Sequence, residues 1–143
     1  ILMNPTIKNG KEILNSKIKK REFWRPYAPS IIKDDCEEWF ECNSSDYMLR
    51  AVKVKKPHLI PCVSHVDGTS RIQTVSHVSN PLFYKLLNEF KKKTGIPMLL
   101  NTSLNVGGQP IFSCKKQCVQ MIENTEIDAI CFGNSIITKN GIS

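Results

Sequence analysis

The chain has 143 residues, of which 41% are hydrophobic and 23% are charged, and its formal net charge is +7. This composition excludes a disordered or fibrous protein and predicts a single globular domain over residues 1–143. No apolar stretch approaches the roughly 20 residues that a membrane helix needs, so we expect no membrane partner. The excess of positive charge indicates an anionic partner, with a solvated basic surface as the alternative.

The six cysteines are consistent with disulfides, a metal site or reduced thiols. No C-x-x-C pair occurs, and none of the three histidines lies at zinc-finger spacing from a cysteine. We therefore expect no metal-ligating residues and a reduced protein of the cytoplasm. The opening ILMNPTIKNGKE has no secretory signal, and the apolar pair before Met3 predicts a piece of a longer chain.

The first candidate site is the basic segment KIKKREFWRPYAPS, residues 17–30. If this segment is an extended strand, Lys19 and Arg21 point to the same face roughly 7 Å apart, which suits two phosphates of one triphosphate. Arg25 would extend this clamp, because Arg and Lys are the usual phosphate ligands. The alternative is a basic edge strand whose charges prevent aggregation.

Two short elements are expected next. DDCEEWF, residues 34–40, predicts an acidic helix with Trp39 and Phe40 on the core, and MLRAVKVKK, residues 48–56, predicts a half-exposed strand.

The second candidate site is SHVDGTSRIQTV, residues 64–75. Its D-G pair signals a turn, and the strand after the turn alternates so that Arg71 is exposed. Asp67 and Thr69 are candidates for orienting a ligand or Mg²⁺, and His65 for carrying a proton. A hairpin with an exposed Arg explains the same pattern without a function, and stabilising the turn is the alternative role of His65.

The segment NPLFYKLLNEFKKKTG, residues 80–95, predicts a helix. Asn80 can cap it, Pro81 suits its first position, lysines complement its negative end and Gly95 ends it. Apolar residues at 82, 83, 86, 87 and 90 should form its buried face. The following IPMLL reads as a buried strand.

The third candidate site follows that strand, in NTSLN. Ser103 and Asn105 have equal parity, so in extended backbone both face one way beyond the carboxyl end of a buried strand, where ligands of α/β sheets often bind. Asn101 opens the same group. Gly107 and Gly108 allow a close backbone approach or a positive φ, and a polar turning loop is the alternative.

The last part of the chain predicts a helix from a Ser113 cap to about Asn124, with Cys118, Val119 and Ile122 facing inward, and closing strands in DAICFGNSIIT. The succession of helices and strands predicts an α/β or α+β fold.

Taken in order, the segments IKKREFWRPYAPS, HVDGTSRIQTV and TGIPMLLNTSLN resemble the C-terminal region of the carbamoyltransferase family, which includes nodulation-factor, cephem and tobramycin carbamoyltransferases. The resemblance implies a YrdC-like fold, a twisted mixed sheet with flanking helices, that binds ATP and carbamoyl phosphate with Mg²⁺ and forms carbamoyl-adenylate. It also implies an N-terminal actin-like, glycoprotease-like domain as partner, which passes the carbamoyl group to a hydroxyl of the acceptor.

The resemblance places the family's K-x-R pair on Lys19 and Arg21 and its S-x-N pair on Ser103 and Asn105. Lys19, Arg21 and Arg71 are then expected to stabilise charge during adenylyl transfer. The full set expected to bind nucleotide and carbamoyl phosphate is Lys19, Arg21, Arg25, His65, Asp67, Thr69, Arg71, Asn101, Ser103 and Asn105.

Two positions depart from the family pattern: Leu104 stands where an aromatic residue is usual, and Gln109 where an acid is usual. The alternatives are a threonylcarbamoyl-adenylate synthase of the stand-alone YrdC type, which serves tRNA modification, and a basic RNA-binding module without catalysis. The aromatic residues do not alternate with basic ones on a predicted strand, so nucleic acid is not the expected partner.

Overall fold

The computed structural model describes residues 1–142. These residues form two compact units, which we describe separately. Among the described residues, unit 1 contains residues 1–11 and 26–102, and unit 2 contains residues 12–25 and 103–142. The single domain expected from the chain length stays a prediction.

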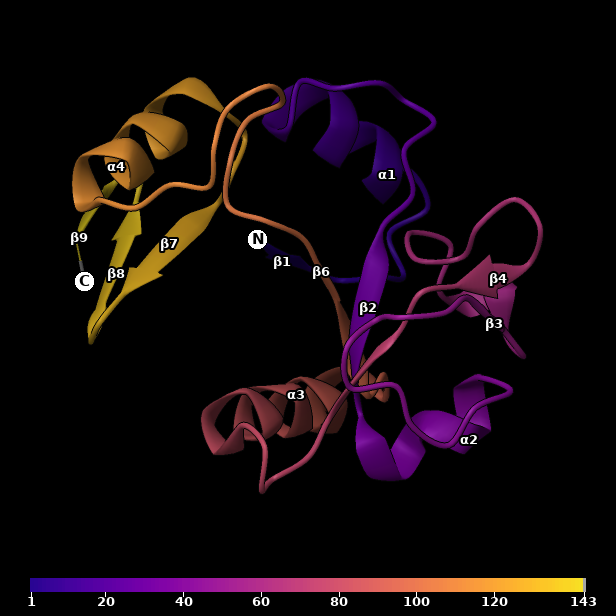
Figure 1. Ribbon diagram of the computed structural model, residues 1–143. Coiled ribbons are helices and arrows are strands. Elements are labelled where there is room, and N and C mark those ends of the chain that lie inside the picture. Colours follow the sequence, from indigo (N-terminus) through magenta and orange to yellow (C-terminus); the bar gives the residue numbers. More distant parts are fainter. Residues whose placement is uncertain (143) are drawn as a thin grey trace. The chain divides into compact units, whose positions relative to one another are not determined.

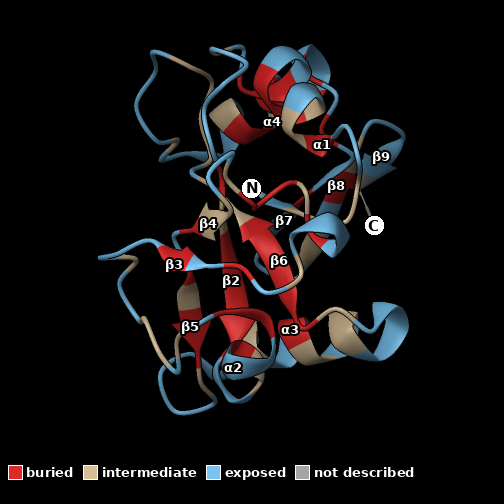
Figure 2. Cartoon of the chain, turned by 90° about the vertical axis from the view of Figure 1, so that its right-hand side faces the viewer, coloured by how far each residue is buried: buried red, intermediate tan, exposed pale blue. Residues whose placement is uncertain are grey.

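Unit 1 is built on a mixed four-stranded sheet (Figure 1). Its strand order is β1-β6-β2-β5, with bounds Leu2–Met3, Met98–Asn101, Ala28–Ile32 and Gln73–Val75. β6 is antiparallel to both of its neighbours, whereas β2 and β5 are parallel. The central strands β2 and β6 are the most buried part of the sheet (Figure 2). This mixed sheet with flanking helices confirms the α+β class.

The central strand β2 was not predicted from the sequence. It contains Pro29, which pairs with Leu100 of β6 although proline has no N–H to donate. Because proline normally argues against an interior strand, the local pattern concealed this element. The buried strand IPMLL, in contrast, is present as β6.

The helix predicted at residues 80–95 is confirmed as α3, Pro81–Thr94. The side chain of Asn80 accepts a hydrogen bond from the N–H of Phe83 at 3.1 Å. Gly95 ends the helix with φ +76°. The caps that the sequence predicts therefore set both ends of the helix.

The predicted buried face of α3 is partly wrong. Leu82 and Leu86 are 82% and 46% exposed, and the face turned to the sheet carries Leu87, with Phe83, Tyr84 and Phe90 beside it. Leu87 joins a buried cluster with Ile32, Val75 and Leu99. The buried face is therefore rotated from the predicted one, towards Phe83, Tyr84, Leu87 and Phe90 and away from Leu82 and Leu86.

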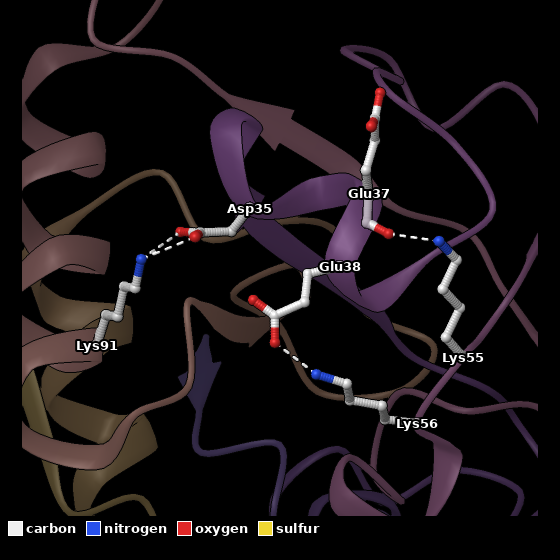
Figure 3. Close-up of polar contacts among 6 residues, drawn as sticks. All are labelled: Asp35, Glu37, Glu38, Lys55, Lys56 and Lys91. Carbon is white, nitrogen blue, oxygen red and sulfur yellow. Dashed lines mark hydrogen bonds and ion pairs between the residues drawn. The ribbon is translucent and has the colours of Figure 1, made fainter.

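The acidic segment forms a 3-10 turn, Lys33–Asp35, followed by α2, Cys36–Trp39. Trp39 and Phe40 are buried, as predicted. Figure 3 shows three lysines that bind this segment: Lys91 to the carboxylate of Asp35 at 2.7 Å, Lys55 to the carbonyl of Glu37 at 2.6 Å, and Lys56 to the carboxylate of Glu38. Each contact is partly exposed, so solvent weakens it and these lysines add little to the stability of the fold.

The strand predicted at residues 48–56 is reduced to β3, Val52–Lys53, which pairs with β4, Thr69–Ser70. A 3-10 turn, Pro57–Leu59, follows β3. The continuous strand predicted after the D-G turn is wrong, because β4 and β5 belong to different sheets. The turn itself forms, with Gly68 at φ +76°.

Unit 2 begins within α1, Gly10–Glu12, which continues as a π-helical segment, Ile13–Ile18. Its second part is α4, Lys115–Asn124, followed by three antiparallel strands: β7 is Ala129–Phe132, β8 is Ser135–Thr138 and β9 is Gly141–Ile142. The closing strands predicted from DAICFGNSIIT are therefore confirmed as the β7–β8 hairpin.

Helix α4 has Cys114 rather than Ser113 as its N-cap residue. Cys118 and Ile122 are buried as predicted, but Met121 takes the third buried position in place of Val119. None of the helices in residues 1–142 is long and apolar enough to cross a membrane.

Candidate functional site

Lys19 and Arg21 do not lie on a strand, so that prediction is wrong. Leu14 and Ile18 are buried and four positions apart, which is the spacing of a helix, and the N–H of Lys19 donates to the carbonyl of Leu14 at 2.7 Å. The helical segment ends there because the chain turns at Lys20, whose φ is +49°. Lys19 therefore caps a helix, and Arg21 lies in the turn after it.

The ammonium group of Lys19 is enclosed by the loop after β6. The side chain is only 2% exposed. Its Nζ donates to the carbonyl of Ser103 at 2.7 Å, to Oγ of Ser103 at 3.1 Å and to Oδ1 of Asn105 at 2.5 Å. These three acceptors match the three protons of an ammonium group, and all three are uncharged.

The charge of Lys19 has no acidic partner among residues 1–142, where no carboxylate forms an ion pair with it. Burial, followed by the nearby charge of Arg21, lowers the pKa of Lys19 to about 8. A buried cation is unfavourable unless an opposite charge compensates it. The surroundings of Lys19 therefore favour the arrival of an anion.

Ser103 and Asn105 contact each other, but not through the extended backbone on which the parity argument rested, so that premise is wrong. The N–H of Asn105 donates to the carbonyl of Ser103 at 3.1 Å, which bends the chain. Oγ of Ser103 donates to Oδ1 of Asn105 at 2.7 Å, and Nδ2 of Asn105 donates to the carbonyl of Gln109 at 2.7 Å. The bend aims two side-chain oxygens at Lys19.

The two glycines fulfil the two roles that the sequence left open. A Cβ at Gly107 would lie 3.0 Å from the carbonyl oxygens of both Lys19 and Lys20, so only glycine fits without a shift. The N–H of Gly107 donates to the carbonyl of Lys19 at 2.5 Å. Gly108 has φ +76°, which glycine adopts without strain.

These residues line a pocket of about 640 Å³, which we call the Lys19 pocket. Its basic members are Lys19, Lys20, Arg21 and Arg25. Glu22, its one acidic member among the described residues, is ion-paired with Nε of Arg25 at 2.8 Å. A pocket of this size and charge suits a small ligand with several negative charges.

Asn15 supports the pocket and was not found from the sequence. It is 1% exposed, its Nδ2 donates to the carbonyls of Phe23 at 3.0 Å and Arg25 at 3.3 Å, and its Oδ1 accepts from Nε of Arg21 at 2.9 Å. The amide thereby fixes the turn that carries the two arginines. The available signal was a polar residue beside Leu14 on the buried side of a helix.

His65, Asp67 and Thr69 form a local cluster in unit 1. The N–H and Oγ1 of Thr69 donate to Oδ1 of Asp67 at 3.0 and 2.7 Å, and Nδ1 of His65 lies 3.1 Å from Oγ1 of Thr69. The contacts with Thr69 lower the pKa of Asp67, and burial lowers the pKa of His65. This geometry is that of a stabilised turn, the structural alternative given above.

Arg71 and Asn101 also belong to unit 1. Nε and Nη2 of Arg71 donate to the carbonyl of Met48 at 3.2 and 3.0 Å. Nδ2 of Asn101 donates to Oγ of Ser30 at 3.1 Å, and that hydroxyl donates to Gln73 at 2.9 Å, so the amide continues a polar row across the sheet. The structure thus brings together Lys19, Arg21, Arg25, Ser103 and Asn105. The ligand roles of the unit 1 residues stay predictions.

The chain is similar to known proteins of one family. The profile of the family described as "Carbamoyltransferase C-terminus" matches residues 1–139. Nodulation protein NolNO of Sinorhizobium fredii is 38% identical over the whole chain, and nodulation protein NolO of Bradyrhizobium diazoefficiens is 36% identical over the whole chain. The 3'-hydroxymethylcephem-O-carbamoyltransferase of Amycolatopsis lactamdurans is 34% identical over 84% of the chain.

The chain spans about a quarter of the length of these relatives: 22% of NolNO, 27% of NolO and 23% of the cephem enzyme.

Proposed function

Because the chain belongs to the carbamoyltransferase C-terminus family, we propose that it is the part of an O-carbamoyltransferase that binds ATP and carbamoyl phosphate and forms carbamoyl-adenylate. The observation that carries this proposal is the buried ammonium of Lys19, which has only neutral acceptors and lies in a pocket with three further basic residues. A triphosphate supplies the missing negative charge.

The basic residues of the Lys19 pocket would contact a triphosphate in different ways. Lys19 already donates three hydrogen bonds, so a phosphate oxygen either replaces one of its neutral acceptors or is held by the ammonium charge alone. Arg21 and Arg25, on the turn fixed by Asn15, present guanidinium groups suited to phosphate. We therefore assign Lys19 a central electrostatic role and the arginines the outer contacts.

The proposed reaction has two balanced steps. Water cleaves carbamoyl phosphate to carbamate and inorganic phosphate. A carbamate oxygen then forms a bond to the α-phosphorus of ATP, and the bond from that phosphorus to the bridging oxygen breaks, so that pyrophosphate leaves with the electron pair. Negative charge on the phosphoryl oxygens is stabilised by Lys19 and Arg21, with Arg71 proposed as a third contributor.

Mg²⁺, when bound, neutralises phosphate charge. Glu22 is the carboxylate in the pocket, and it is engaged by Arg25, so the phosphates themselves would supply most of the magnesium ligands.

The proposal extends to the rest of the protein. An actin-like, glycoprotease-like domain would pass the carbamoyl group from the adenylate to a hydroxyl of the acceptor. His65, Asp67, Thr69 and Asn101 are kept as proposed contacts of nucleotide or carbamoyl phosphate.

All six cysteines are free thiols, which supports a reducing compartment such as the cytoplasm.

Calorimetric titration of the purified chain with magnesium-ATP tests the proposal. Lys19→Met removes the charge and keeps most of the stem, so we expect at least a roughly tenfold loss of affinity, whereas Lys92→Met, on α3, should bind as the parent does. Equal small effects of both changes would refute a specific site. Pyrophosphate release should need carbamoyl phosphate; release that needs threonine and bicarbonate would favour the threonylcarbamoyl-adenylate alternative.

A further inference from the structure

Helix α3 has apolar side chains on two sides, and unit 1 covers only one of them. Leu87 packs against the sheet with aromatic residues beside it. Leu82 and Leu86, which are four residues apart, lie outside this contact and are exposed, and Val78 in the turn before the helix is 92% exposed. Exposed apolar side chains that gather on one face mark an interaction site.

Two opposite charges lie beside these leucines. Leu82, Leu86 and Glu89 are spaced by four and three residues, and Lys85 precedes Glu89 by four, so all four side chains share one side of the helix, which we call the outer face of α3. Among the ion pairs of residues 1–142, none includes Lys85. Glu89 is paired with Lys92 at 2.7 Å in an exposed contact, which solvent weakens. The outer face therefore combines apolar side chains with one cation and one anion that are both open to a new partner.

The charges of the outer face complement each other when two copies of α3 run antiparallel. Residues 91–93 are all lysines and end the helix, so a parallel pairing would bring the two sets of lysines together. An antiparallel pairing places the two sets at opposite ends and aligns the helix dipoles favourably. If its centre is level with residue 87, Lys85 of each copy is level with Glu89 of the other, and the Leu86 side chains of the two copies meet.

We propose that the outer face of α3 is the interface of a symmetric, antiparallel homodimer of this chain. A two-fold interface uses the same patch on both copies, as this face allows. Leu82 and Leu86 supply the apolar contact, and two pairs between Lys85 and Glu89 set the register. A contact made by a single helix is at the small end of interface sizes, so we expect a dissociation constant on the order of 10–100 µM.

Sedimentation equilibrium of the purified chain between about 5 and about 500 µM tests the interface. Leu82→Ser combined with Leu86→Ser should raise the dissociation constant at least roughly tenfold. Leu49→Ser is the matched control, because Leu49 is an exposed leucine of unit 1 outside α3, and this variant should dimerise as the parent does. Circular dichroism of each variant checks that the helices are retained.

Charge reversal tests the register without changing an apolar side chain. Lys85→Glu alone and Glu89→Lys alone each place like charges across the interface, so each should weaken the dimer several-fold. The two changes in one chain should restore it. A mixture of the two single variants should form a mixed dimer, because one variant carries two acidic side chains at these positions and the other carries two lysines.

The outcomes either support or overturn the proposal. A parent chain that stays monomeric throughout the concentration range overturns it and leaves the outer face to a different protein. A dimer that survives the double leucine variant overturns the assignment to α3. A dimer that the leucine variant weakens, but that charge reversal leaves unchanged, overturns the antiparallel register. Loss in each single charge variant with recovery in the double variant and in the mixture supports the proposal in full.

Discussion

The ammonium nitrogen of Lys19 lies 2.5 Å from Oδ1 of Asn105, a residue 86 positions later in the chain. This contact joins the end of the first helical segment to the loop after β6 through a buried cation and a neutral amide. Such a contact responds to pH, because Lys19 titrates and Asn105 does not.

The affinity for ATP should fall as the pH rises above about 8. Burial holds the pKa of Lys19 at about 8, well below its usual 10.5, so the charge that attracts phosphate is lost in this range. The affinity should drop towards tenfold per pH unit between about pH 8 and about pH 9.5. Calorimetry across this range should show the fall in the parent chain and a flat profile in Lys19→Met; the same slope in both would assign the effect to another group.

Stability should change in the opposite direction. Between the folded pKa of about 8 and the unfolded pKa of about 10.4, the unfolded chain binds one more proton at Lys19 than the folded chain does. The free energy of unfolding therefore rises with pH in this window. Urea denaturation of the parent, compared with Lys19→Met at each pH, isolates this contribution from cysteine and tyrosine titration. A free energy of unfolding of the parent that stays level or falls with pH, relative to that of Lys19→Met, would contradict the burial of a charged Lys19.

Ser103→Ala combined with Asn105→Ala should preserve the fold and abolish ATP binding. Both residues lie in a bend near the surface, but Lys19 keeps only one of its three acceptors, the carbonyl of residue 103, when both side chains are removed. The buried ammonium then favours its neutral form, and the affinity should fall at least roughly tenfold.

Circular dichroism and calorimetry measure the two effects on this double variant. Ser76→Ala combined with Ser79→Ala is the control, because these hydroxyls also bond to one another in an exposed loop of unit 1. Loss of folding in the Ser103 and Asn105 variant alone would make the loop structural rather than ligand-binding.

Helices and strands whose ends are marked by local sequence signals could be predicted from the sequence. α3 has a cap, a first-turn proline and a terminal glycine, so its bounds follow from local rules. β2 could not be found in this way, because Pro29 is held in an interior strand by β6 and β5, which lie far along the chain. Tertiary pairing, rather than local preference, decides that strand.

The candidate site, like the fold, could be predicted from the sequence only in part. The parity of Ser103 and Asn105 predicted that their side chains face one way from an extended backbone, whereas the backbone bends and the bend brings the two side chains into contact. The strand assumed for Lys19 was wrong because its charge pattern was considered without the helical spacing of Leu14 and Ile18. The role of Asn15 depends on carbonyls eight and ten residues later, which no local pattern specifies.

Two Gly→Ala variants separate the effect of a steric overlap at the site from the effect of backbone strain elsewhere. Gly107→Ala should weaken ATP binding, because the new methyl group pushes against the carbonyls of Lys19 and Lys20, and overpacking of this kind costs about 1–3 kcal/mol. Gly95→Ala, at the end of α3 in unit 1, meets nothing within 4 Å but has φ +76°. It should lower the free energy of unfolding by about 1–2 kcal/mol and leave ATP affinity unchanged. Equal ATP affinities in the two variants would contradict the close approach at Gly107.

Asn15→Ala should impair both stability and ATP binding. The change leaves the carbonyls of Phe23 and Arg25 without their amide donor and Nε of Arg21 without its acceptor, which costs about 1–3 kcal/mol. Because the freed turn carries both arginines, the affinity for ATP should fall several-fold. Ser70→Ala, which removes a buried hydroxyl bonded to a carbonyl in unit 1, should destabilise the chain without this fall. If both variants lose stability and neither loses affinity, as urea denaturation and calorimetry would reveal, the turn held by Asn15 does not position the arginines for phosphate.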